Sequence, residues 1–364
     1  MNFNIICSLR NLLFSIICLF SVLSCNRKES NIVLSRDIEG FTAFPFEKSL
    51  TFTKVFEYDK GRISRLFIKD SSLIIFNHSV GCKYFLYNYS LDEKNLSKGY
   101  LKKGRGPYEA LGGFHCGIKN DILWVNDVTL KRVTMLPLSK FLENTDGINY
   151  RSYDLTDFYA SIDFIDSLKF IGNGFRGSTS KVITYDVVEN TKIKEIGNFY
   201  HIPKNLEVDA LMDAYSGYLW AKPSNEKAVL AYFLTDVIEV FNFDDYSCCS
   251  LQGPHFFDVE FNVATNRYGQ NYAGESKKMR NAFVGGCVTN QFIYLVFSGQ
   301  LESERSSSQP KVESIFVYDW DGNPIQKLKI NNQIGAIAVS KDDKEIYAYD
   351  VETGNIIKSH LSIN

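Results

Sequence analysis

The chain has 364 residues, a formal net charge of −2, and a composition that is 45% hydrophobic and 14% aromatic. This apolar content supports a packed core, which argues against a disordered chain, and the lack of a basic excess argues against nucleic acid as a partner. The 28 Phe and 21 Tyr residues favour strands, because aromatic side chains fit the pleated, half-buried surface of a β-sheet.

The N-terminus predicts export rather than a folded element. Arg10 precedes a short apolar run from Leu12 to Leu23, and Ser24 and Cys25 follow it. A basic residue, a short apolar run and a small residue at its end are typical of a secretory signal peptide. The run is too short to cross a hydrocarbon core of about 30 Å. We therefore expect residues 1–24 to be removed.

The end of this signal, Val22-Leu23-Ser24-Cys25, resembles the lipobox of bacterial lipoproteins. The resemblance implies lipidation of Cys25, a polar tether over residues 25–50, and a place in the cell envelope as an outer-membrane lipoprotein on its periplasmic or surface side. Several acyl chains, at about 0.8 kcal/mol per buried CH₂, would hold such a protein on a membrane. The alternative is an ordinary signal peptide that contains Cys25.

The remaining cysteines and the histidines do not form a metal-binding pattern. No CxxC or spaced Cys/His pattern is present, and no two of the five histidines have the i, i+4 spacing of a zinc helix, so we expect no metal and no cofactor. An odd number of cysteines leaves at least one thiol unpaired. We expect most of them to be buried as small hydrophobes. The five are Cys82, Cys116, Cys248, Cys249 and Cys287.

From residue 51 onward the sequence repeats a unit of alternating strand, polar turn and second strand. The clearest copy turns at Asp321-Gly322, and Asp-Gly between alternating runs is the strongest short hairpin signal. Paired inner strands precede the copies, for example Asp121 to Val125. The six copies begin at Phe85, Arg132, Val182, Val237, Ser314 and Asn355.

Each inner pair and its outer hairpin would make a four-stranded sheet of roughly 40 to 50 residues, which is typical of a propeller blade. We therefore predict an all-β fold, a six-bladed β-propeller over residues 51–364. The last repeat is one strand short, and Thr51 to Tyr58 alternates well. We expect this N-terminal strand to close the last blade, because closure of the ring removes exposed sheet edges.

The stretch from Gly104 to Glu109, followed by Ile122 to Asp127, is similar to an NHL-type propeller repeat. Together with the lipobox and Phe316 to Pro324, the chain resembles the TolB-like six-bladed propeller lipoproteins of Bacteroidetes. The resemblance implies an envelope propeller that serves as a binding module, and it supplies no catalytic residues. Tyr108 stands where the family has a second glycine, which predicts a reshaped turn.

Two insertions interrupt the repeats and are candidates for functional segments. Loops of this length are usually functional or disordered. The insertion from Leu301 to Pro310 is polar and rich in serine, so we expect a surface excursion. The insertion from Pro254 to Gly286 is aromatic, and we expect it to be ordered over one face of the ring. Its candidate binding residues are Phe257, Arg267, Tyr268 and Tyr272.

Other candidates have a structural alternative. Arg105 and Glu109 belong to a blade-to-blade connection that could also face a ligand. Several aspartates end alternating strands, where such residues commonly cap the next turn by accepting backbone N–H bonds. A ring of carboxylates for catalysis or calcium is the alternative for them. These aspartates are Asp127, Asp186, Asp319 and Asp350.

The sequence contains no catalytic motif, so we expect a protein without enzymatic activity. The first hypothesis is a membrane-anchored envelope module that binds a protein or glycan through one ring face and its long loop. The alternative is an envelope enzyme, a glycan lyase or hydrolase, which would need carboxylates close enough to couple in the central channel. A third hypothesis is a structural scaffold without a soluble ligand.

Overall fold

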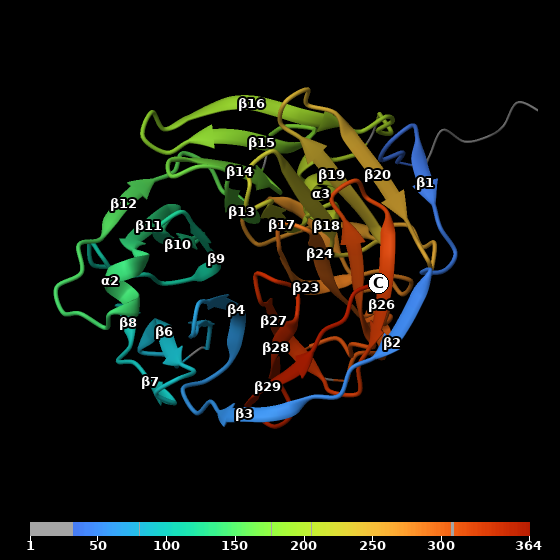
Figure 1. Ribbon diagram of the computed structural model, residues 1–364. Coiled ribbons are helices and arrows are strands. Elements are labelled where there is room, and N and C mark those ends of the chain that lie inside the picture. Colours follow the sequence, from blue (N-terminus) through green and yellow to red (C-terminus); the bar gives the residue numbers. More distant parts are fainter. Residues whose placement is uncertain (1–31, 80, 176, 205, 307–308) are drawn as a thin grey trace, which may run out of the picture.

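The computed structural model describes residues 32–79, 81–175, 177–204, 206–306 and 309–364, so Cys25 and the predicted signal peptide lie outside the described residues. Figure 1 shows six antiparallel sheets arranged as blades around a central channel. The predicted all-β, six-bladed propeller is confirmed. In each blade the first strand lies at the channel and the later strands lie progressively further out.

The blades follow one another along the chain. Blade one comprises β4 (Ile63–Lys69), β5 (Ser72–Asn77), β6 (Tyr84–Ser90) and an outer strand split into β7 (Asn95–Leu96) and β8 (Tyr100–Lys102). Blade two comprises β9 (Gly113–Lys119), β10 (Ile122–Asp127), β11 (Arg132–Pro137) and β12 (Arg151–Asp154). Blade three comprises β13 (Ser161–Phe164), β14 (Lys169–Asn173), β15 (Ser180–Asp186) and β16 (Thr191–Asn198). Blade four comprises β17 (Gly217–Ala221), β18 (Lys227–Tyr232), β19 (Val237–Asn242) and β20 (Cys248–Gln252). Blade five comprises β23 (Phe283–Val288), β24 (Phe292–Phe297), β25 (Ser314–Asp319) and β26 (Pro324–Lys329). Blade six contains β27 (Ile334–Val339), β28 (Glu345–Asp350) and β29 (Asn355–His360).

An N-terminal strand closes the ring, as predicted. β3 (Thr53–Glu57) pairs antiparallel with β29 and completes blade six. Phe56 on β3 stacks on Tyr89 of blade one, with ring centroids 3.6 Å apart and the planes 7° from parallel. The first and last parts of the propeller are thus joined by backbone hydrogen bonds within blade six and by aromatic packing onto blade one.

The prediction of a tether over residues 25–50 is wrong for its second half. β1 (Ile38–Gly40) adds in parallel to β20, and β2 (Phe46–Ser49) adds in parallel to β26. Figure 1 shows this segment running along the outside of blades four, five and six. The outer strand of a sheet offers unpaired N–H and C=O groups, and β1 and β2 cover two such edges. The propeller therefore begins before residue 51.

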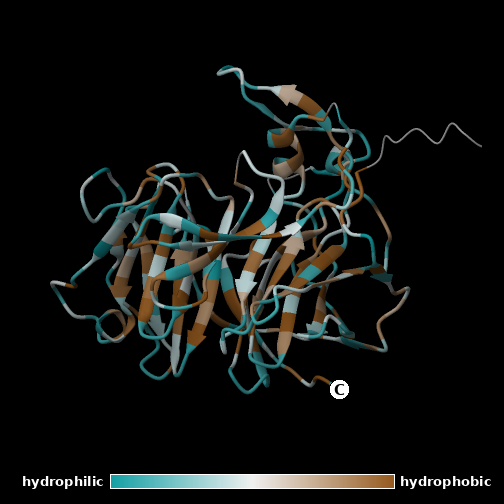
Figure 2. Cartoon of the chain, turned by 90° about the horizontal axis from the view of Figure 1, so that it is seen from above, coloured by the Kyte–Doolittle hydropathy of each residue, from teal (hydrophilic) through white to brown (hydrophobic). Residues whose placement is uncertain are grey.

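The short helices and the aromatic insertion lie in the connections between strands. The insertion forms a separate hairpin of β21 (Asn262–Thr265) and β22 (Asn271–Gly274), which contacts α3 (Val208–Ala214). Seen edge-on in Figure 2, a helix and a short strand rise above one end of the ring, while the C-terminus lies at the other end. The other helices in the described ranges are α2 (Leu138–Leu142) and the 3-10 turn η1 (Glu302–Glu304). None of the helices within the described ranges is long and apolar enough to cross a membrane.

One ion pair is buried between blades three and four. The Nζ atom of Lys181 on β15 lies 2.6 Å from Oε1 of Glu239 on β19, and the two side chains are 4% and 0% exposed. Glu239 also accepts hydrogen bonds from the hydroxyls of Tyr232, at 2.6 Å, and Ser250, at 2.8 Å. Such full satisfaction is what a buried charge requires.

The aspartates at strand ends cap turns, as predicted. Oδ1 of Asp127 accepts the backbone N–H groups of Thr129 and Leu130 at 2.9 and 3.0 Å. The equivalent carboxylates make the same kind of bonds within two to four residues: Asp186, Asp319 and Asp350. These side chains therefore fix the tight turns of the blades.

Candidate functional site

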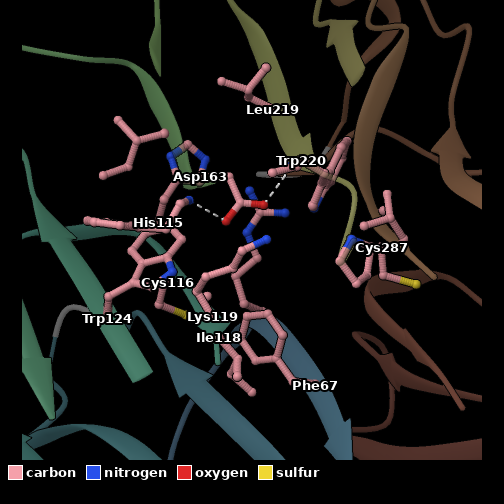
Figure 3. Close-up of a pocket in the computed structure, with 18 of the residues that line it drawn as sticks. Phe67, His115, Cys116, Ile118, Lys119, Trp124, Asp163, Leu219, Trp220 and Cys287 are labelled. Carbon is pink, nitrogen blue, oxygen red and sulfur yellow. Dashed lines mark hydrogen bonds between the residues drawn. The ribbon is translucent and has the colours of Figure 1, made fainter. Parts of the chain in front are cut away.

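The channel contains a cavity of about 140 Å³, lined by the inner strands of blades one to five (Figure 3). Each inner strand begins near the end of the ring that carries α3 and the hairpin, and runs to the opposite end. The lining includes the last residues of several of these strands, such as Lys119 of β9, Phe164 of β13 and Val288 of β23. The cavity therefore lies toward the end of the channel away from the hairpin.

Charged and polar side chains from three different blades meet in this cavity. Arg65 comes from β4, His115 and Lys119 come from β9, and Asp163 comes from β13. Arg65 and Lys119 are only 8% and 6% exposed. Each of these residues stands in a short apolar strand, so the strand pairing that buries the apolar neighbours also carries the charge to the channel.

Asp163 joins the inner strands of blades three and four. Its Oδ2 accepts the backbone N–H of Ala221 on β17 at 2.8 Å, and its Oδ1 accepts the N–H of Phe164 at 2.8 Å (Figure 3). The hydroxyl of Ser161, two residues earlier, accepts the N–H of Leu219 at 3.0 Å. Polar side chains of β13 thus satisfy the free edge of β17. Desolvation raises the pKa of Asp163 to about 6, although the Ala221 N–H and the charge of Lys119 oppose the shift.

Arg65 is held by aromatic rings. Its guanidinium carbon lies 4.7 Å from the ring centroid of Tyr218 and 5.4 Å from that of Trp220. Trp220 can occupy this position because Gly286 faces it: a Cβ at residue 286 would lie 3.0 Å from the indole and would clash with the carbonyl oxygen of Tyr294. The glycine therefore makes room for the aromatic support of the cation.

The other titratable groups of the cavity are shifted toward their neutral forms. Burial lowers the pKa of the His115 imidazole well below its usual value and also lowers the pKa of Lys119. Burial raises the pKa of the Cys116 and Cys287 thiols. A protonated thiol is a poor nucleophile. Among the described residues, Asp163 is the single carboxyl group of the lining, whereas glycosidic hydrolysis generally needs two. The site is suited to binding a charged group rather than to this chemistry.

A second cavity of about 380 Å³ opens at the end of the ring that carries the hairpin. Tyr218 lines this cavity and also contacts Arg65, which lines the first cavity. Its ring packs edge-on against Phe233, with centroids 4.8 Å apart. Tyr218 thus contacts residues of both cavities.

The aromatic insertion presents an ordered, exposed surface. The N–H of Ala273 on β22 donates to Oδ2 of Asp213 on α3 at 3.0 Å, which fixes the hairpin to the helix. At the tip, the guanidinium of Arg267 lies 4.7 Å from the ring centroid of Tyr268 and donates to its hydroxyl at 2.6 Å. Tyr268 is 70% exposed. The hairpin therefore holds an arginine and a tyrosine together in solvent.

A family model described as "TolB-like 6-blade propeller-like" matches residues 41–342. The chain belongs to this TolB-like propeller family. Two solved structures have a similar fold. A Bacteroides fragilis protein assigned as exported is 10% identical with a TM-score of 0.55, covering 90% of this chain and 100% of that one. A member of the duf4221 family from Bacteroides vulgatus is 12% identical with a TM-score of 0.55, covering 87% and 99%. At these identities the likeness shows the fold alone. The search of curated proteins found no match.

In this TolB-like propeller the candidates Arg105 and Glu109 belong to the connection between blades one and two. Glu109 accepts the N–H of Gly106 at 2.9 Å and lies 3.3 Å from the Lys102 ammonium, and these two contacts lower its pKa. Glu109 therefore stabilises the connection, whereas Arg105 is exposed. Tyr108 does not take a positive φ and packs on Tyr150, with ring centroids 5.9 Å apart.

The candidates of the insertion divide into an anchor and an exposed group. Phe257 is partly buried, 6.4 Å from the Phe297 ring, and its carbonyl accepts the Thr235 hydroxyl at 2.7 Å. Arg267, Tyr268 and Tyr272 are exposed on the hairpin. They lie between blades four and five in the chain, far around the ring from Arg105, so the structure does not bring the two candidate groups together (Figure 1).

Sequence reasoning missed the channel cluster. A usable signal was present: Arg65 and Asp163 are charged residues among apolar neighbours in the first strand of their repeats. In a propeller the first strand of each blade faces the channel, so a lone charge there is brought to the axis of the ring.

Proposed function

We propose that this propeller is a membrane-anchored, non-catalytic binding module of the cell envelope, which captures a protein partner through the β21–β22 hairpin. The lipid anchor at Cys25 rests on the sequence. The B. fragilis structure of similar fold is a protein assigned as exported, which agrees with an envelope location. The ordered, exposed hairpin with Arg267 over Tyr268 is the observation that carries the proposal.

The residue types of the hairpin favour a protein over a glycan. Tyrosine and arginine are enriched among the residues that dominate protein interfaces. The β21–β22 sheet has only two strands, with β22 against α3, so a partner strand could add to the open edge of β21. Val263 on β21 is exposed and supplies apolar contact area beside that edge.

The test uses the full-length, lipidated protein carrying Arg267→Ser and Tyr268→Ser. After crosslinking in intact envelopes, we expect the wild type to retain a specific protein and the double variant to lose it. Capture that survives in the double variant would contradict the proposal, as would a partner that is removed by glycan-degrading enzymes instead of proteases.

Tyr246→Ser is a matched control. Tyr246 is an exposed tyrosine with Lys194 Nζ 3.3 Å from its ring centroid, so it also forms a cation–π pair. It lies in the turn before β20, whereas the insertion leaves from the end of β20, so the two tyrosines lie at opposite ends of the ring. This variant should capture the partner as well as the wild type does.

A further inference from the structure

The guanidinium of Arg65 has no hydrogen-bond acceptor among the described residues. Arg65 is 8% exposed, yet within the described part of the chain its guanidinium takes part in no hydrogen bond or ion pair. Burying an ionised group without a partner is costly. The rings of Tyr218 and Trp220 attract the charge, but a cation–π contact leaves the five N–H donors unbonded. The unused donors belong to a residue that lines the cavity.

Among the described residues, one carboxyl group of the lining, that of Asp163, faces two basic groups, and the charges of Lys119 and Arg65 both lower its pKa. Lys119 brings a second basic group, and its Nζ has a backbone acceptor, the carbonyl of Lys222, at 3.4 Å. The single lining carboxyl, Asp163, is already bonded to the N–H groups of Ala221 and Phe164. Nδ1 of His115 and Nε1 of Trp124, both in lining residues, have no hydrogen-bond partner among the described residues. Polar atoms buried in this way normally have a partner.

The walls beside these groups are apolar. Phe67, Phe164 and Leu219 line the same cavity as Arg65. A site that offers a cation beside hydrophobic surface suits a ligand with an anionic head and an apolar body. A volume of about 140 Å³ has room for roughly ten water-sized atoms.

We propose that the channel cavity binds a small organic anion of up to about ten non-hydrogen atoms, whose carboxylate or phosphate head takes the free N–H donors of Arg65. The planar guanidinium matches both heads in a bidentate arrangement, and its charge strengthens each hydrogen bond. Tyr218 and Trp220 hold the guanidinium in place, and the apolar walls accept the body of the ligand. This site is separate from the hairpin and does not depend on its partner.

Benzoate, benzamide and inorganic phosphate are suitable probes, because benzoate and benzamide share a shape and differ in charge. We expect saturable benzoate binding by calorimetry, with a change in tryptophan fluorescence because Trp220 and Trp124 line the cavity. Benzamide should bind at least about tenfold more weakly. Binding of phosphate alone would support a phosphate head. Failure of both anions to bind at millimolar concentration, or equal binding of benzoate and benzamide, would overturn the proposal.

Variants locate the anion. Arg65→Met should weaken the binding of benzoate at least about tenfold. Arg65→Lys keeps the charge but loses the paired N–H donors of the guanidinium, and it should weaken the binding less. Arg36→Gln is the matched control, since it removes one exposed positive charge that lies 6.0 Å from the ring centroid of Tyr200, and it should leave benzoate binding within about twofold. Unchanged affinity in a folded Arg65→Met protein would overturn the assignment. If that variant does not fold, the benzoate and benzamide comparison on the wild type still decides.

Discussion

Two buried cations of this propeller, Lys181 and Arg65, have opposite surroundings. Lys181 lies between blades three and four, 2.6 Å from Glu239, and Glu239 accepts two further hydroxyl hydrogen bonds. Arg65 lies in the channel, where the rings of Tyr218 and Trp220 contact its guanidinium and no described carboxylate lies within ion-pair distance, although its charge lowers the pKa of Asp163. Both side chains are less than a tenth exposed.

The difference separates a structural charge from one that is available to a ligand. The counterion of Lys181 is a carboxylate that the fold itself supplies, so the pair holds two blades together. The donors of Arg65 belong to a cavity wall. A buried charged group in a cavity, without a hydrogen-bonding partner in the fold, is a candidate for a functional position. The predictions below test this contrast from the largest expected effect to the smallest.

Removing the acceptor of Lys181 should have the largest effect. Glu239→Gln leaves a buried ammonium without its counterion and should lower the free energy of unfolding by about 3 kcal/mol in urea titrations at pH 7. The control is Glu195→Gln, which breaks an exposed pair with Lys192 of 2.9 Å and should cost less than about 1 kcal/mol. Equal losses in the two variants would show that the buried pair is not a structural element.

Asp163 predicts a pH dependence of stability. Its pKa of about 6 lies above the unfolded value, so between pH 4 and 6 the folded state keeps a proton that the unfolded chain has lost. Stability should therefore fall by about 2 kcal/mol as the pH rises through this window. Asp163→Asn removes the titrating carboxyl group and leaves Arg65, His115 and Lys119 of the same cavity unchanged. In this variant the part of the pH dependence of stability that comes from Asp163 should disappear. If stability depends on pH in the same way in the variant and the wild type, the pKa of Asp163 is not raised.

The hairpin should contribute binding without stability. Arg267→Ser with Tyr268→Ser removes exposed side chains, so the free energy of unfolding should change by less than about 0.5 kcal/mol while partner capture is lost. Thermal unfolding followed by circular dichroism checks the first part. A marked destabilisation would mean that the tip supports the fold, and the capture result would then need a milder substitution, Tyr268→Phe.

The blades could be predicted from the sequence because their signals are local. The alternation of Ser314 to Asp319 and the Asp321-Gly322 turn lie within a few residues of one another, and closure by Thr53 to Glu57 followed from the missing strand. β1 and β2 could not be predicted in this way. β1 has three residues, and every residue of β2 is exposed, so neither has an apolar pattern.

Charged residues in the first strands of the repeats indicate the channel, but which of them meet could not be predicted, because the cluster depends on distant residues. Arg65, His115 and Asp163 are about 50 residues apart from one to the next, and only the ring brings them together. The contacts of the candidate Glu109 could not be predicted for a similar reason. Its acceptor role toward Gly106 is a detail of loop geometry that residue type alone does not fix.

The most direct test compares the ligand-free stability of Arg65→Met and Lys181→Met at pH 7. Lys181→Met leaves Glu239 buried without its cation and should cost about 3 kcal/mol, whereas Arg65→Met removes a charge that the fold does not pair and should change stability by no more than about 1 kcal/mol. If Arg65→Met loses as much stability as Lys181→Met, Arg65 is a structural cation and the contrast between the two sites is wrong.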